Sequence, residues 1–220
     1  MTTDTIYRAV LFDLDGTLLN TLEDIANSAN RVLERLGFPQ HSLEAYKYFV
    51  GDGREALASR IVPSSHRDAN TIARVVDWID GEYNQHWADM TRPYEGVPEL
   101  LQALTARGTK MAVLSNKPDD LTKLMVSTIL SHWQFELVIG VRPSVPRKPD
   151  PAAALDIAEC LKIVPREFLY LGDTDTDMKT ADASGMYPIG ASWGFRTADE
   201  LLANGAKALI SKPMELLKFL

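Results

Sequence analysis

The sequence predicts an α/β protein with a Rossmann-like core, in which a mainly parallel sheet carries helices on both faces, plus an inserted helical cap subdomain. Two observations support this fold class. Strand-like and helix-like segments alternate from Pro93 to the C-terminus, which is typical of a covered parallel sheet. Helical patterns fill residues 19–90 without a convincing strand. We therefore predict a core of residues 1–18 and 91–220 and a helical cap of residues 19–90.

The first part of the chain reads as one strand followed by helices. The apolar run from Ala9 to Phe12 suits a strand that is buried on both faces, and a polar turn follows it. Apolar residues then recur at helical spacing between Thr21 and Leu36, and Gly37 is a typical stop signal. Further helices are expected over residues 42–49, with Ser42 as the cap, and over residues 54–62 and 68–87.

The second part of the chain alternates between the two kinds of element. Apolar runs predict strands over residues 110–115, 135–140, 168–172, 187–191 and 208–210. Helical spacing predicts helices over residues 98–107, 118–130, 151–161, 175–184 and 198–203. Glycines at 108 and 185 mark two of the helix ends. In such sheets a ligand binds at the carboxyl ends of the strands.

Composition excludes several classes of partner. The net charge of −7 argues against binding to nucleic acid or to an anionic membrane. Apolar runs are far shorter than the roughly 18 residues of a membrane span, and residues 1–8 lack the pattern of a signal peptide. The single cysteine, Cys160, cannot form an intrachain disulfide, and its apolar helical context predicts a buried thiol. We therefore expect a cytoplasmic protein, either a monomer or a homodimer.

Polar side chains follow four of the expected strands. They are Asp13, Asp15, Ser115, Asn116, Lys148, Asp173 and Asp177. Clustered carboxylates repel one another, so they need a proton or a cation, and hard oxygen ligands suit Mg²⁺. A lysine offers a point charge to a phosphate, and a serine hydroxyl and backbone N–H groups can donate to the same anion. An aspartate is already ionised at neutral pH and needs no base to act as a nucleophile. The pattern predicts phosphoryl transfer through an aspartyl-phosphate.

Four segments resemble the motifs of the haloacid-dehalogenase superfamily. They are Asp13-Leu-Asp-Gly-Thr17, Ser115-Asn116, Arg147-Lys-Pro-Asp-Pro151 and Gly172-Asp-Thr-Asp-Thr-Asp177. The helical insert after the first motif resembles the cap of that superfamily. Three further segments look most like its phosphoglycolate-phosphatase branch: Asn20-Thr-Leu-Glu-Asp24, Phe49-Val-Gly-Asp-Gly-Arg-Glu55 and Ser115-Asn-Lys-Pro-Asp119.

The resemblance implies a role for each motif residue. Asp13 would be the nucleophile and a Mg²⁺ ligand. Asp15 would protonate the leaving alkoxide and later deprotonate the attacking water, while its backbone carbonyl binds Mg²⁺. Ser115 and Lys148 would hold the phosphoryl oxygens. The catalytic residues are thus Asp13, Asp15 and Lys148. The metal group is Asp13, Asp15, Asp173 and Asp177, in which Asp177 would touch the metal or act through Lys148.

A second group is expected to contact the substrate. It comprises Thr17, Arg54, Ser115, Asn116 and Lys117. Arg54 follows a Gly-Asp-Gly break in the cap, and it either binds a substrate carboxylate or only begins a helix. Lys117 is either a second cation facing the substrate or a surface residue. Asp175 lies between the matched acidic positions and is expected to be structural or exposed.

Several functions fit these residues. We expect Mg²⁺-dependent hydrolysis of a small phosphorylated metabolite, with 2-phosphoglycolate as the first candidate. A sugar phosphomutase, a pyrophosphatase or a nucleotidase of the same superfamily would use the same motifs. A dehalogenase is disfavoured because it has no leaving alkoxide for Asp15 to protonate. Outside the enzymes, a regulatory phosphoacceptor domain also uses Asp, Mg²⁺ and Lys at strand ends, although such domains are usually shorter and lack a cap.

Overall fold

The computed structural model describes residues 6–143 and 145–220. The chain divides into two compact units, one of Met1–Leu18 with Pro93–Leu220 and one of Leu19–Arg92. The boundaries expected from the sequence lie within two residues of this division. The expectation of no signal peptide rests partly on residues 1–5, which lie outside the described residues. Within the described ranges, no helix is both long enough and apolar enough to span a bilayer.

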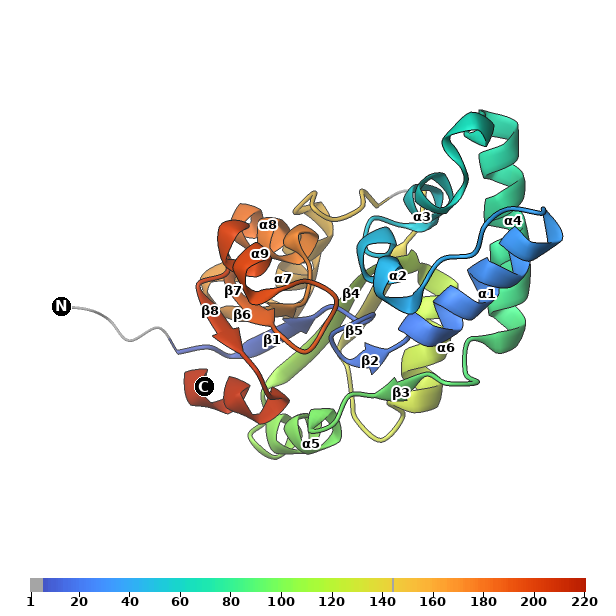
Figure 1. Cartoon of the computed structure of the whole chain (residues 1–220). Coiled ribbons are helices and arrows are strands. Elements are labelled where there is room, and N and C mark those ends of the chain that lie inside the picture. Colours follow the sequence, from blue (N-terminus) through green and yellow to red (C-terminus); the bar gives the residue numbers. More distant parts are fainter. Residues whose placement is uncertain (1–5, 144) are drawn as a thin grey trace. The chain divides into compact units, whose positions relative to one another are not determined.

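The first unit is built on a six-stranded parallel sheet in the order β5-β4-β1-β6-β7-β8 (Figure 1). Its strands are β1 (Ala9–Phe12), β4 (Lys110–Pro118), β5 (Leu137–Val141), β6 (Phe168–Gly172), β7 (Tyr187–Ala191) and β8 (Ala208–Ile210). The central strands β1 and β6 are buried along their whole length, as their apolar sequences predict. The predicted Rossmann-like, mainly parallel fold is confirmed.

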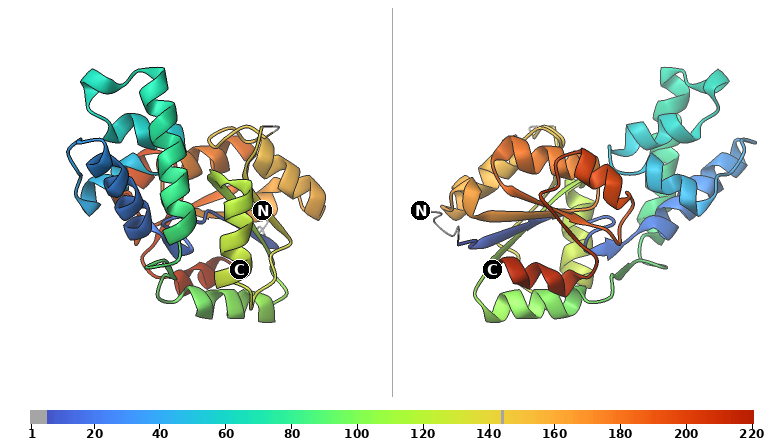
Figure 2. Two further views of the ribbon diagram at one scale, coloured as in Figure 1. Left: turned by 90° about the vertical axis from the view of Figure 1, so that its right-hand side faces the viewer. Right: turned by 60° about the vertical axis from the view of Figure 1, so that its left-hand side comes forward.

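Helices cover both faces of this sheet. They are α5 (Val97–Ala106), α6 (Asp119–Ile129), α7 (Ala152–Leu161), α8 (Asp175–Ser184) and α9 (Ala198–Ala203), with 3-10 helices η2 (Pro165–Glu167) and η3 (Pro213–Phe219). The helices α7, α8 and α9 lie on one face, and α5 and α6 lie on the other with η3 beside α5 (Figure 2). This layering follows from right-handed crossovers that leave β1 first toward β5 and then return toward β8.

The strand register decides which residues meet at the carboxyl edge of the sheet. Phe12 pairs with Val113 on one side and with Leu171 on the other. Asp13 therefore lies level with Gly172, and Asp173 follows one residue further along. On the other side the ladder between β4 and β5 is irregular from Leu114 to Pro118. The irregular stretch contains Ser115, Asn116 and Lys117. In such a stretch, side chains no longer alternate between the two faces of the sheet.

The second unit is helical. It contains α1 (Leu22–Arg35), α2 (Leu43–Phe49), α3 (Arg54–Ile61), η1 (Ser64–His66) and α4 (Ala69–His86), together with the short strand β2 (Leu19–Asn20). β2 pairs with β3 (Arg92–Pro93), whose second residue already belongs to the first unit. The Ser42 hydroxyl accepts a hydrogen bond from the backbone of α2, as expected of a cap. The helices α1 and α4 pack together, and Glu82 of α4 forms ion pairs with Arg31 and Arg35 of α1.

Three expectations from the sequence are corrected. Cys160 is exposed rather than buried. The inward stripe of α7 contains Ala153, Ala154, Ile157 and Ala158. Cys160 lies about 90° around the helix from the centre of that stripe. The strand expected over residues 135–140 begins at Leu137, since the Phe135 ring packs edge-on against Phe12 before the ladder starts. The strand expected to end at Ser115 runs on to Pro118 through the irregular segment.

Candidate active site

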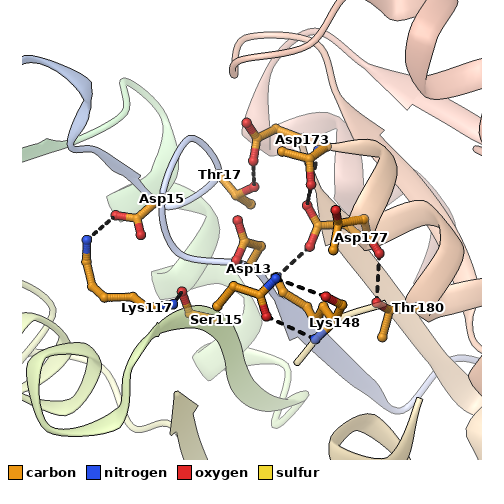
Figure 3. Close-up of polar contacts among 12 residues, drawn as sticks. Asp13, Asp15, Thr17, Ser115, Lys117, Lys148, Asp173, Asp177 and Thr180 are labelled. Carbon is orange, nitrogen blue, oxygen red and sulfur yellow. Dashed lines mark hydrogen bonds and ion pairs between the residues drawn. The ribbon is translucent and has the colours of Figure 1, made fainter. Parts of the chain in front are cut away.

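The Lys148 ammonium joins two carboxylates from separate strand ends. Its Nζ lies 2.7 Å from Asp13 Oδ1 and 2.6 Å from Asp177 Oδ1. All three side chains are buried. Carboxylate oxygens of Asp13, Asp173 and Asp177 lie within 4.8 Å of one another, so three acids converge on one point (Figure 3). Segments that lie more than a hundred residues apart in the chain thus form one charged cluster.

Asp173 is held from two directions. The Thr17 hydroxyl donates to Asp173 Oδ1 at 2.8 Å, and the Phe195 backbone N–H donates to Oδ2 at 2.8 Å. Two glycines pack closely against this side chain. A Cβ on Gly16 would lie 2.2 Å from Asp173 Oδ2, and one on Gly194 would lie 2.3 Å from Asp173 Cβ. Only glycine leaves room for this side chain, so its position is tightly determined.

Asp177 is oriented by its own helix. Its Oδ2 accepts hydrogen bonds from the Thr174 backbone N–H at 3.1 Å and the Thr174 hydroxyl at 2.7 Å, which forms a capping box at the start of α8. The hydroxyl of Tyr170, buried in β6, donates to Asp177 Oδ1 at 3.4 Å. With Oδ1 also on Lys148, both oxygens of Asp177 are engaged within the protein.

Burial and nearby charges shift the pKa values of Asp13, Asp173 and Lys148. Burial, aided by the neighbouring charge of Asp177, raises the pKa of Asp13 well above its usual value and that of Asp173 to about 7. Burial alone would lower the pKa of Lys148, but the charges of Asp13 and Asp177 outweigh it and the pKa is raised. Lys148 therefore stays an ammonium, and its one positive charge pairs with Asp13 and Asp177 while a third carboxylate, Asp173, lies close by.

Asp15 belongs to a second ion pair at the same edge. Its Oδ1 lies 3.0 Å from Lys117 Nζ, and the Lys117 side chain is 6% exposed. The Lys117 backbone N–H donates to Ser115 Oγ at 3.2 Å. Lys117 is therefore a buried cation beside the cluster rather than a surface residue.

Asn116 connects two of the motif segments. Its Nδ2 donates to the Lys148 carbonyl at 3.1 Å, and its Oδ1 accepts from the Lys148 backbone N–H at 2.9 Å. The amide therefore satisfies both backbone polar groups of a residue 32 positions away. This pair of bonds holds the loop that carries Lys148 against the end of β4.

The structure brings most of the expected site residues together. One neighbourhood in the first unit contains Asp13, Asp15, Thr17, Ser115, Asn116, Lys117, Lys148, Asp173 and Asp177 (Figure 3). Arg54 lies in the other unit, at the start of α3, and forms ion pairs with Asp80 and Glu55. Asp175 is partly exposed and pairs with Lys179 one turn along α8. Its expected place outside the cluster agrees with this contact.

Sequence reasoning missed other residues of the site. Trp193 Nε1 donates to the Thr17 carbonyl at 3.0 Å, and the Phe195 backbone reaches Asp173. Burial, together with the charges of Asp173 and Asp15, raises the pKa of Tyr94, which places this phenol close to the acids. Each of these residues lies outside the four motifs. No local pattern marks them, although aromatic residues soon after β7 and before α5 indicate segments next to strand or helix ends.

Known proteins share both the sequence and the fold. A family model of haloacid dehalogenase-like hydrolases matches residues 10–191. Phosphoglycolate phosphatases from Pseudomonas putida and Chromobacterium violaceum are 33% and 32% identical to this chain. The first match covers 87% of this chain and 71% of the relative, and the second covers 96% of each. The crystal structure of a predicted phosphoglycolate phosphatase from Haemophilus somnus covers 99% of both chains with a TM-score of 0.89 at 25% identity.

These matches decide between two of the classes that the motifs left open. The family is one of hydrolases, so a regulatory phosphoacceptor domain is set aside in favour of an enzyme. Its match includes Asp13, Lys148 and Asp173. The chain belongs to the haloacid dehalogenase-like hydrolase family, and within that family it is a phosphatase.

Proposed function

We propose that this enzyme hydrolyses a small phosphate monoester with Mg²⁺ as its cofactor and 2-phosphoglycolate as the preferred substrate. The observation that carries the proposal is the Lys148 ammonium shared between Asp13 and Asp177 with Asp173 alongside. Such a cluster has more negative charge than its one cation balances, so it suits a metal ion and a phosphate together. Curated relatives that carry the name phosphoglycolate phosphatase support the choice of substrate.

The donor set of the cluster fits Mg²⁺. Its oxygens are hard carboxylate ligands and they are buried. Burial first and the charge of Asp177 second raise the pKa of Asp13 and of Asp173, and a cation would offset both causes. Asp13, Asp173 and the backbone carbonyl of Asp15 would hold the ion. Asp177 would act through Lys148, since its two oxygens are already engaged by Lys148 and Thr174. When bound, Mg²⁺ would neutralise charge on the phosphoryl oxygens and make the phosphorus a better electrophile.

Two carboxylates would share the chemistry. An Asp13 oxygen attacks the phosphorus and forms a P–O bond as the bond to the ester oxygen breaks, and Asp15 gives its proton to the departing alkoxide. Asp15 then removes a proton from a water that attacks the phosphorus. The Asp13–phosphate bond breaks, which releases inorganic phosphate and restores the Asp13 carboxylate. Lys117, 3.0 Å from Asp15, would hold that side chain in position between the two steps.

Three further groups would bind the phosphoryl oxygens. Ser115 Oγ accepts a hydrogen bond from the Lys117 backbone N–H, and its own O–H would donate to a phosphoryl oxygen. Lys148 would supply the charge, and Asn116 would hold the Lys148 backbone in place rather than touch the substrate. Thr17 is wholly buried and donates to Asp173, so we assign it to orientation of that carboxylate instead of to substrate binding.

The substrate proposal is tested by a Mg²⁺-supplemented screen of small phosphate esters measured as kcat/KM. We expect 2-phosphoglycolate to exceed glycerol phosphates, sugar phosphates, nucleotides and pyrophosphate by more than about tenfold, which is about 1.4 kcal/mol of discrimination in the transition state. The assignment fails if any of these substrates wins by that margin. Conversion of β-glucose 1-phosphate to glucose 6-phosphate with a trace of bisphosphate would replace the phosphatase by a phosphomutase.

The predicted contact of Arg54 with a substrate carboxylate has its own test. Arg54→Met should lower kcat/KM for 2-phosphoglycolate at least about tenfold, while p-nitrophenyl phosphate, which has no carboxylate, loses less than about threefold. Arg74→Met is the matched control, because Arg74 lies over the Trp78 ring on α4. Equal losses on both substrates would assign Arg54 a structural role at the start of α3.

We also propose a cytoplasmic location and a monomeric or homodimeric state, with the phosphorylated metabolite as the only partner. The single cysteine of the chain supports a reducing compartment. Light scattering on the purified full chain distinguishes the two oligomeric states, and a larger mass would contradict both.

A further inference from the structure

A loop outside the four motifs contacts Asp173 and the turn at Thr17. It runs from Ser192 to Phe195 directly after β7, and we refer to it as the post-β7 loop. Neither charge nor metal-ligand chemistry marks it in the sequence, since it contains a serine, a tryptophan, a glycine and a phenylalanine. Three consecutive residues of the loop nevertheless contact the site.

The first two contacts are hydrogen bonds to different parts of the site. Trp193 Nε1 donates to the Thr17 carbonyl at 3.0 Å, across 176 residues of sequence. That bond restrains the turn that carries Asp15. The Phe195 backbone N–H donates to Asp173 Oδ2 at 2.8 Å. Thr17 in turn donates to the other Asp173 oxygen, so the loop, the turn and the carboxylate form one connected chain of hydrogen bonds.

The third contact is steric. Gly194 packs so closely that an added Cβ would lie 2.3 Å from Asp173 Cβ and 2.5 Å from Oδ2. Real atoms do not approach this closely, so the backbone of the loop forms one wall around the carboxylate. Gly16 also packs against this carboxylate, since an added Cβ there would lie 2.2 Å from Oδ2. Asp173 therefore has little freedom to rotate away from Asp13 and Asp177.

We propose that the post-β7 loop is a positioning element for the metal site, which sets Mg²⁺ affinity by holding Asp173 and the turn of Asp15 in their ligating orientation. The inference rests on the proposed function, because it takes Mg²⁺ as the ion that Asp173 binds. Its physical basis is that a ligand restrained beforehand loses less side-chain entropy when the metal enters. Removing such an outer contact typically weakens metal binding about 10–100-fold.

The experiment measures metal binding without turnover. The full-length wild type, Trp193→Phe and Ser192→Ala are titrated with Mg²⁺ by calorimetry, and with Mn²⁺ followed by electron paramagnetic resonance. Trp193→Phe keeps the aromatic ring and removes the single indole donor. Ser192→Ala is a matched control in the same loop, since the Ser192 hydroxyl donates to the Ile210 carbonyl in β8 and not to the site. Gly194→Ala tests the steric wall, and thermal unfolding checks that each variant is folded.

We expect Trp193→Phe to weaken metal binding roughly tenfold and folded Gly194→Ala by more, while Ser192→Ala stays within about twofold of the wild type. In turnover assays the Mg²⁺ concentration for half-maximal rate should rise by the same factor. The kcat at saturating Mg²⁺ should return to near the wild-type value, which a general structural defect would not do. Wild-type metal affinity in folded Trp193→Phe overturns the inference alone. No metal binding by the wild type overturns the inference together with the metal part of the proposed function.

Discussion

Buried carboxylates occur in both units of the molecule, but they are neutralised in different ways. In the helical unit, Asp24 of α1 is 2% exposed, and its two oxygens accept hydrogen bonds from the Met90 and Thr91 backbone N–H groups and the Thr91 hydroxyl at 2.8 to 3.0 Å. In the α/β unit, carboxylate oxygens of Asp13, Asp173 and Asp177 lie within 4.8 Å of one another, and one ammonium, that of Lys148, pairs with Asp13 and Asp177. Hydrogen-bond donors of Met90 and Thr91 satisfy both oxygens of Asp24. The cluster, in contrast, has three carboxylates and one ammonium.

The difference separates a structural acid from a functional one. A buried charge that is fully hydrogen-bonded holds two segments together, here α1 and the chain that follows α4. Burial and the nearby charge of Asp177 raise the pKa of Asp13 and of Asp173, so their charged forms cost stability unless a cation binds. Replacement of an acid by its amide should therefore lower stability at Asp24 but not at Asp13.

The largest contrast is expected at Asp13. Asp13→Asn removes the nucleophile and should lower kcat on p-nitrophenyl phosphate by at least about 10³-fold. Stability without metal should stay level or rise, because the raised pKa of Asp13 shows that its charged form is disfavoured in the fold. Urea unfolding with EDTA measures the second effect. Near-normal turnover would exclude the aspartyl-phosphate route, and a large loss of stability would contradict the contrast with Asp24.

The second prediction removes the shared cation. Lys148→Met leaves Asp13 and Asp177 buried without their ammonium, and breaking such a pair costs about 3–5 kcal/mol of unfolding free energy. Urea unfolding at neutral pH measures the loss. Lys123→Met is the control, since Lys123 forms an exposed pair with Asp119 and should change stability by less than about 1 kcal/mol. Similar losses of unfolding free energy in the two variants would show that Lys148 does not compensate the buried charges of Asp13 and Asp177.

The third prediction concerns the helical unit. Asp24→Asn replaces one acceptor oxygen by an amide that faces N–H donors, so it should lower the free energy of unfolding by about 1–3 kcal/mol. The neighbouring exposed residue supplies the control, Glu23→Gln, for which we expect almost no change. A rise in stability on Asp24→Asn would show that the donors around Asp24 do not compensate its buried negative charge.

The sequence predicts the charged cluster because its signals are local. Each acid follows an apolar run, and in a parallel sheet the ends of such runs meet at one edge. The register of β1 with β6 then brings Asp13 next to Gly172 and Asp173. The placement of Asp13 and Asp173 at one edge of the sheet could therefore be predicted from apolar runs and turn residues, whereas the strand order is known only from the structure.

Contacts between distant segments could not be predicted in this way. The Asn116 amide meets the Lys148 backbone only because β4 becomes irregular beyond Leu114, and sequence patterns predict a regular strand that ends at Ser115. Trp193 reaches Thr17 through the fold of a loop whose residues show no periodicity. Cys160 appeared buried because apolar neighbours mark a helix but do not say how wide its inward stripe is.

The fourth prediction uses the pH dependence of the metal-free protein. The pKa of Asp173 is raised to about 7 in the folded protein, whereas the pKa of an aspartate in an unfolded chain is about 3.9. The folded state therefore binds more protons between these values, and stability should fall as the pH rises from about 4 to about 7. Urea midpoints in EDTA measure the fall. Saturating Mg²⁺ should flatten it, because a bound cation lowers the pKa. Stability that rises with pH across this range would contradict the excess of negative charge.

The smallest effect is expected at Asp175, which lies between Asp173 and Asp177 in sequence but outside their cluster. Its carboxylate pairs with Lys179 on α8 at 2.6 Å and is partly exposed. Asp175→Asn should change kcat/KM by less than about twofold. It should lower the free energy of unfolding by at most about 1 kcal/mol, because the exposed ion pair and the charge at the helix N-terminus are lost. Kinetics and urea unfolding of the same sample measure both. A loss of turnover near that of Asp13→Asn would extend the functional acids along α8, and it would show that shared charge in a buried cluster is not what distinguishes them.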